Sequence, residues 1–324
     1  MDKSSWVTQV NQKLANMEDA VNEREKWKKS SIYKVPSCLT DLNKKAYLPQ
    51  VVSFGPYHHG QHHLIQMEEH KQRALLHFLK RSDKPLDLYL NSLAEVAQDL
   101  KDSYNPLPTQ LQDANKFLQL MIVDGYFMLE ILRFAAHNLD DYADNDPIFS
   151  YHGKLYIMPS IKRDMLKLEN QLPMLLLEKL VTIDLNKTKD DELLYKLILK
   201  FCSPIPATSI SSMGKCLHVL DVYKKSLLYQ VKPGRTHQRK LRASHHKDSD
   251  DIIRSATEIN EAGIRFKESK TASLKDIRFK GGVLQLPTII VDDATESMFL
   301  NLIAFERFHV GASDLLHIFY GQHH

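Results

Sequence analysis

The chain has 324 residues, of which 43% are hydrophobic and 26% are charged. This is enough apolar sequence to bury the core of one large domain or two smaller ones. The formal net charge of +3 is small for this length and gives no strong electrostatic indication of a nucleic-acid partner. The polar N-terminus and the absence of a long apolar run predict neither a secretory signal nor a membrane span.

The first half of the chain predicts a series of helices separated by one long loop. Apolar residues at helical spacing give the expected helix ranges, which are 5–18, 67–81, 86–104 and 112–136. The last range is apolar nearly all round between Leu118 and Leu132, so this helix should be central and buried. The stretch "AYLPQVVSFGPYHHG" (46–60) carries two prolines and two glycines and predicts an extended, turn-rich loop.

The second half predicts more helices and one β element. Residues 160–180, "SIKRDMLKLENQLPMLLLEKL", indicate two helices that Pro173 separates. Further helices are expected at about 190–202 and 213–230, before Gly263, and over 294–308. Gly281-Gly282 lies between two β-rich runs and predicts a hairpin near 276–292. The expected fold class is therefore mainly α, a compact multi-helix domain with one small β-hairpin.

The expected domain organisation is one helical domain with two flanking segments. Residues 1–34 form an N-terminal helix and a charged entry segment, 35–310 the domain, and 311–324 a short tail. The polar segment 231–251 predicts a disordered loop within the domain. It holds six Lys and Arg residues over 232–247, which indicate a solvated loop or, as the alternative, a contact with anionic lipid or nucleic acid.

Histidines gather in the stretch "FGPYHHGQHHLIQMEEHKQR" (54–73), where four of them occupy positions 58, 59, 62 and 63. The spacing of four residues within each pair would suit a metal on a helix. Gly55, Pro56 and Gly60 favour a loop with surface histidines instead. His70 follows Glu68 and Glu69 in the first turn of a helix. Either these acids complement the positive helix end, or His70 faces inward with a carboxylate partner as a general acid–base group.

Three acids are further chemical candidates. Asp124 sits inside the apolar helix and must be paired, protonated or hydrogen-bonded there. Gly125 indicates a close helix crossing or a local break. Asp164 and Glu169 flank an apolar turn before Pro173. Proline has no N–H, so it leaves a helical backbone carbonyl without a donor, and in the favoured interpretation the polar residues next to Pro173 bind such carbonyls. In the alternative interpretation these polar residues line a pocket at the helix break.

Glu130 follows Asp124 by six residues on the same predicted helix, about 120° away around its axis. The two acids are therefore expected to serve different partners. A catalytic site is expected only if His70, Asp124, Asp164 and Glu169 converge in one pocket. No known nucleotide-binding, hydrolase or kinase motif is present, and no cofactor is expected.

Several stretches together resemble a plant family known as "domain of unknown function 247". They run in family order and include "VSFGPYHHG", "MEEHKQRALLHFLKR", "MIVDGYFMLEILR", "DMLKLENQLP" and "LPTIIVDDATESMFLNLIAFE". The resemblance implies a plant protein with a largely helical fold. Family members usually continue further and end in a membrane anchor, whereas this chain stops soon after Glu306, so a soluble or peripherally attached protein is expected. Some members are implicated in self-incompatibility recognition, and the resemblance supplies no catalytic residues.

Two functions remain open at this point. The first is a recognition and signalling module that binds a protein partner in the cytoplasm, or peripherally at the plasma membrane. The odd number of cysteines, Cys38, Cys202 and Cys216, without a C-x-x-C pair is typical of such a reducing compartment. The alternative is an enzyme of plant specialised metabolism that acts on a small molecule with His70 and the buried carboxylates as acid and base.

Overall fold

A computed structural model describes residues 3–15, 24, 27–136, 141–185, 191–203, 213–228, 254–269, 271 and 273–309. The predicted loop 231–251 and the predicted tail 311–324 lie outside these residues. The described part is mainly helical, as the sequence predicts, and its sheets are small.

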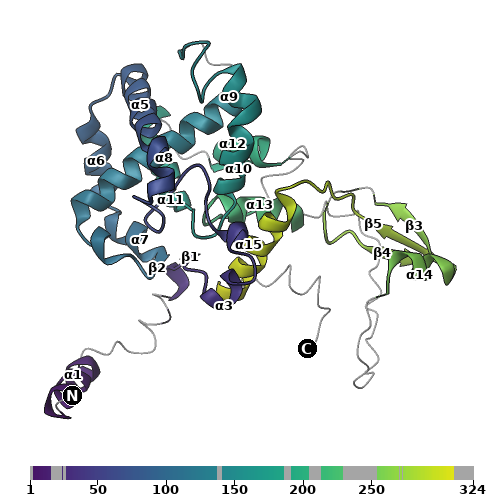
Figure 1. Cartoon of the computed structure of the whole chain (residues 1–324). Coiled ribbons are helices and arrows are strands. Elements are labelled where there is room, and N and C mark those ends of the chain that lie inside the picture. The colour runs from purple at the N-terminus through teal and green to yellow at the C-terminus, as the bar shows by residue number, and fades with distance from the viewer. Residues whose placement is uncertain are drawn as a thin grey trace.

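Helices make up most of the described chain (Figure 1). Those of the first half are α1 (Lys3–Ala15), α3 (Ser37–Thr40), α4 (Lys44–Tyr47), η1 (His62–Leu64), α5 (Ile65–Ser82), α6 (Leu86–Ala94), α7 (Ala97–Asp102), η2 (Thr109–Leu111) and α8 (Ala114–Ala136). Those of the second half are α9 (Tyr151–Tyr156), α10 (Met158–Met165), α11 (Met174–Leu185), α12 (Asp191–Cys202), α13 (Val219–Leu228), α14 (Ala256–Glu261) and α15 (Thr295–Phe308). The helix expected over 86–104 is two helices, because the backbone leaves the helical conformation at Val96.

Helix α8 is the centre of the domain, as its apolar sequence predicts. Helices α5, α6, α11 and α12 pack around it (Figure 1). Gly125 allows the crossing with α11, since a Cβ at this position would lie 2.6 Å from Leu180 Cδ1. The predicted close crossing is confirmed, and α8 continues through Gly125 without a break.

The C-terminal helix α15 closes the other side of the domain against α4 and strand β1. Asn301, which is fully buried, holds this junction. Its side-chain amide donates to Ala46 O, and its side-chain oxygen accepts from Leu168 N. One asparagine thereby joins α15 to α4 and to the segment that follows α10.

Two small sheets complete the fold. Strands β1 (Ile32–Tyr33) and β2 (Tyr104–Asn105) pair in parallel, and β3 (Arg265–Glu268), β5 (Val283–Leu286) and β4 (Arg278–Lys280) form a second sheet in that order. The antiparallel pair β4–β5 turns at Gly281-Gly282, both with positive φ, which confirms the predicted hairpin. The sequence prediction omits β3, which pairs in parallel with β5.

Candidate functional site

The loop between α4 and η1 is the most heavily anchored non-helical segment that the sequence analysis singled out. We call residues 48–58 the anchored loop. Most of its residues are buried although it belongs to neither sheet. Buried backbone N–H groups need partners, and here other elements supply them through side chains. The predicted turn-rich loop is therefore present, but it belongs to the core.

Asp164, at the end of α10, anchors the start of this loop. Its fully buried carboxylate accepts hydrogen bonds from the backbone N–H groups of Gln50, Val51 and Val52, at 2.7 to 3.0 Å. Burial raises the pKa of Asp164, and these three donors oppose that rise. Every one of these partners is backbone, so the carboxylate serves as a connector between α10 and the loop.

Asp124 of α8 anchors the middle of the loop and is paired with a lysine. Its Oδ2 accepts from Gly55 N at 2.8 Å, and its Oδ1 lies 2.7 Å from Lys71 Nζ of α5. Both side chains of this ion pair are fully buried. Lys71 also donates to Ser53 Oγ and to Glu68. Burial raises the pKa of Asp124, and the charge of Lys71 opposes the rise.

Glu169 anchors the end of the loop through His58, a residue that the sequence analysis placed at the surface. His58 is buried, and its Nε2 lies 3.2 Å from Glu169 Oε2. Glu169 also accepts from Val35 N at 2.6 Å and from Lys34 Nζ. Burial favours the neutral acid, but His58, Val35 and Lys34 together hold the pKa of Glu169 below its ordinary value.

The amides that follow Glu169 satisfy backbone groups at the end of α10. Asn170 donates to Val52 O and Asp164 O and accepts from Phe54 N. Gln171 donates to two carbonyl oxygens near the end of α10, those of Met165 and Lys167. These contacts are the structural role that the sequence analysis favoured for the polar residues before Pro173.

His70 lies apart from these three acids. It is half-buried on α5, and its Nδ1 lies 3.2 Å from Arg73 Nη2. Arg73 in turn pairs with Asp146. Among the described residues, the structure records no hydrogen bond or ion pair between His70 and Asp124, Asp164 or Glu169. The four candidate residues therefore have separate partners. Asp124 and Glu130 also have different partners, as expected, because Glu130 binds Arg81, Arg133 and Tyr142.

The histidine cluster also divides. His58 is buried against Glu169, His59 Nδ1 lies 4.0 Å from Glu68 Oε2, and His63 Nε2 lies 3.1 Å from Pro49 O. Across the described ranges, no group of three or more His, Cys, Asp or Glu side chains is gathered in a way that would hold a metal ion. The apolar residues that flank the Gly55-Pro56 turn were the sequence signal that could have indicated the burial of His58.

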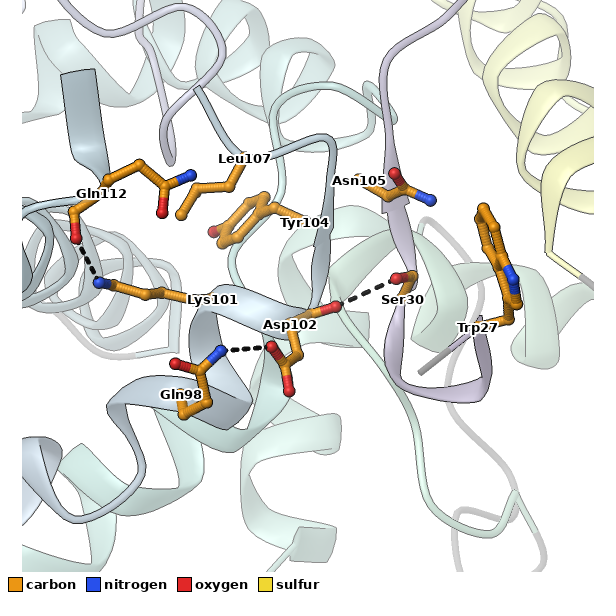
Figure 2. Close-up of a pocket in the computed structure, with 9 residues that line it drawn as sticks. All are labelled: Trp27, Ser30, Gln98, Lys101, Asp102, Tyr104, Asn105, Leu107 and Gln112. Atoms are coloured by element: carbon orange, nitrogen blue, oxygen red, sulfur yellow. Dashed lines mark hydrogen bonds between the residues drawn. The ribbon is translucent and has the colours of Figure 1, made fainter. Parts of the chain in front are cut away.

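A pocket of about 360 Å³ opens beside α7 (Figure 2). Its walls come from α7, from the segment before β1, from β2 and from the chain between β2 and α8. The lining side chains are aromatic, amide, hydroxyl and charged groups and one leucine, namely Trp27, Ser30, Gln98, Lys101, Asp102, Tyr104, Asn105, Leu107 and Gln112. None of the four candidate catalytic residues lines it.

A second pocket, of about 420 Å³, lies between the first turns of α5 and α8. His59, Glu68, Lys116 and three glutamines contribute to its polar lining. Glu68 connects this pocket to the buried pair behind it, because its Oε1 lies 2.7 Å from Lys71 Nζ. The pocket thus meets the outer end of a polar network that begins at Asp124.

The three-stranded sheet presents an exposed apolar row. Phe266, Leu284 and Phe279 occupy directly paired positions on three adjacent strands, so their side chains share one face. Phe279 is 62% exposed. Four other exposed apolar residues flank these strands in the sequence, namely Ile277 just before β4 and Ile289, Ile290 and Val291 after β5. We call these seven residues the apolar patch.

The opposite face of the sheet is basic. The alternation of strand side chains places four cations there, namely Arg265, Lys267, Arg278 and Lys280. Both edge strands, β3 and β4, are short, and their residues are exposed. In Figure 1 the sheet lies beside α14, away from the helices that surround α8.

Comparisons with known proteins identify relatives in plants. The model of a family described as plant protein of unknown function, DUF247, matches residues 32–320. The UPF0481 protein At3g47200 of Arabidopsis thaliana is 31% identical over 87% of this chain, and the putative UPF0481 protein At3g02645 of the same plant is 25% identical over 94%. The chain spans 62% and 56% of the length of these two relatives. No solved structure matches, and none of the described helices is long and apolar enough to cross a membrane.

Proposed function

We propose a recognition function for this chain, which belongs to DUF247, a family of plant proteins of unknown function. In this proposal the helices around α8 form a rigid support, and the apolar patch on the three-stranded sheet binds a protein partner. The exposed patch is the observation that carries the proposal. Phe266, Leu284 and Phe279 are neighbours on one face of the sheet, and clusters of exposed apolar side chains mark binding surfaces.

The chemistry of the sheet indicates the kind of partner. The centre of a protein interface is usually apolar. The row of Phe266, Leu284 and Phe279 therefore indicates a partner with complementary apolar side chains, whereas the four cations lie on the opposite face of the sheet. The three free thiols of Cys38, Cys202 and Cys216 support a cytoplasmic location for this recognition and signalling role.

The separate partners of the candidate acids also support recognition over catalysis. General acid–base chemistry needs the acting groups within reach of one substrate. Asp164 is bound to backbone N–H groups, and Asp124 is neutralised by Lys71. These contacts anchor a loop, and they give the acids a structural role that needs no substrate.

Affinity purification from plant extract with matched variants tests the proposal. Phe279→Ser combined with Ile290→Ser removes two side chains of the patch, which are 62% and 61% exposed. The control is Leu42→Ser, because Leu42 is 85% exposed and lies outside the patch. We expect a partner that the wild type and the control retain and the patch variant loses.

A binding measurement with the purified partner completes the test. The patch variant should bind it at least about tenfold more weakly, which corresponds to about 1.4 kcal/mol. Equal recovery by wild type and patch variant would contradict the proposal. So would patch-dependent self-association in analytical ultracentrifugation without any other partner, because a second copy would then cover the patch.

A further inference from the structure

The pocket beside α7 is elongated and preformed. Figure 2 shows Trp27 at one end and Gln112 at the other, with the remaining lining side chains between them. Two hydrogen bonds close its walls, one from Ser30 Oγ to Asp102 O and one from Lys101 Nζ to Gln112 O. A ligand would enter a cavity whose walls are already joined, which lowers the entropic cost of binding.

The two charged side chains that line the pocket, Lys101 and Asp102, have opposite signs, and each has a hydrogen-bond partner within the protein. Lys101 donates to the backbone oxygen of Gln112 at 2.6 Å. Asp102 accepts from Gln98 Nε2 at 2.6 Å and lies 3.4 Å from Lys29 Nζ. Because the lining carries one cation and one anion and no net formal charge, it favours a neutral ligand over an anion or a cation.

The uncharged lining groups define the ligand more closely. Gln98, Asn105 and Gln112 carry amides, each of which offers donors and an acceptor side by side. A hydroxyl group likewise both donates and accepts. Trp27 is 61% exposed and supplies a flat apolar surface against which a ring can pack. Amides along the pocket and an aromatic side chain at its end match a ligand with several hydroxyl groups and an apolar ring face.

We propose that this pocket binds a neutral oligosaccharide, with one sugar ring against Trp27 and the hydroxyl groups of further rings on the amides of Gln98 and Gln112. The pocket volume of about 360 Å³ lies within the range of small-molecule sites. The proposal is independent of the apolar patch, whose residues belong to other elements.

Tryptophan fluorescence provides a site-specific test, because Trp6 and Trp27 are the two tryptophans of the chain. Trp6 is 65% exposed on α1, so Trp6→Phe leaves Trp27 as the single reporter without loss of core packing. The probes are cellotriose, xylotriose and maltotriose, with trigalacturonic acid as the charged comparison and triglycine as the peptide comparison. Ligand-observed NMR with the same probes detects binding that leaves the emission unchanged.

We expect at least one neutral trisaccharide to bind saturably below about 10 mM, a weak affinity typical of few contacts. Gln98→Ala and Gln112→Ala should each weaken binding at least about fivefold. The control Gln72→Ala, an exposed glutamine of the other pocket, should leave it unchanged. The proposal is overturned if no neutral trisaccharide binds, if the charged sugar or triglycine binds more tightly, or if both pocket variants bind like the wild type.

Discussion

Replacement of Lys71 by methionine removes the cation from a pair in which both side chains are fully buried. Methionine keeps much of the apolar stem, but the Asp124 carboxylate is left with the Gly55 N–H as its remaining partner. At the 2.7 Å separation of Nζ and Oδ1, the attraction is about 6 kcal/mol for an effective dielectric constant of about 20. Because the carboxylate stays desolvated, we expect the free energy of unfolding to fall by about 3–5 kcal/mol at pH 7.

Urea unfolding followed by far-ultraviolet circular dichroism measures this loss. Burial raises the pKa of Asp124, and Lys71→Met removes the charge that opposes the rise. Protonation then relieves the buried charge, so the deficit relative to the wild type should shrink as the pH falls below 7. The control Lys29→Met breaks an exposed pair with Asp99 and should cost at most about 0.5 kcal/mol. A Lys71→Met deficit below about 1 kcal/mol, or one independent of pH, would refute the reasoning.

Three further predictions concern stability. Gly125→Ala places a methyl group 2.6 Å from Leu180 Cδ1 and should lower the free energy of unfolding in urea by about 1–3 kcal/mol. The same substitution should cost less when it is introduced into a Leu180→Ala variant, because the side chain that it meets is then removed. Burial lowers the pKa of His218 from 6.5 to about 4, so the unfolded chain binds the extra proton between these values and the wild type loses stability on acidification. His218→Gln should remove up to about 1.4 kcal/mol per pH unit of that dependence, and an unchanged profile would contradict it. Burial lowers the pKa of Lys167 from 10.5 to about 8, so the wild type should gain stability relative to Lys167→Met as the pH rises between these two values. An equal difference in the free energy of unfolding at both pH values would argue against this prediction.

The helices could be predicted because their signal lies within each segment. The apolar character of residues 118–132 indicated a central helix, and Gly125 indicated its close crossing with a neighbour. The strand β3 could not be found in the same way. It carries a single apolar residue, Phe266, and becomes a strand through pairing with β5, which follows later in the chain. Pairing between distant segments leaves little pattern in either one.

The candidate acids show the same limit. The sequence required a partner for Asp124, since an isolated carboxylate in an apolar helix is too costly, and the structure gives it Lys71. The identity of the partner could not be predicted, because it depends on how α5 packs against α8. His58 is the clearest failure. Gly55, Pro56 and Gly60 suggested a surface loop, whereas the structure buries His58 against Glu169 of a distant segment.

The anchored loop also has a consequence for the kinetics of folding. Its contacts join residues far apart in sequence, with 69 positions between Gly55 and Asp124 and 112 between Val52 and Asp164. Such contacts carry a large entropy of chain closure, so we expect them to form after α8 and α10 have packed. Interactions absent from the transition state slow unfolding and leave the folding rate unchanged. Asp164→Asn should therefore raise the unfolding rate in stopped-flow measurements while refolding keeps its rate, which would make this loop a determinant of how long the native state persists.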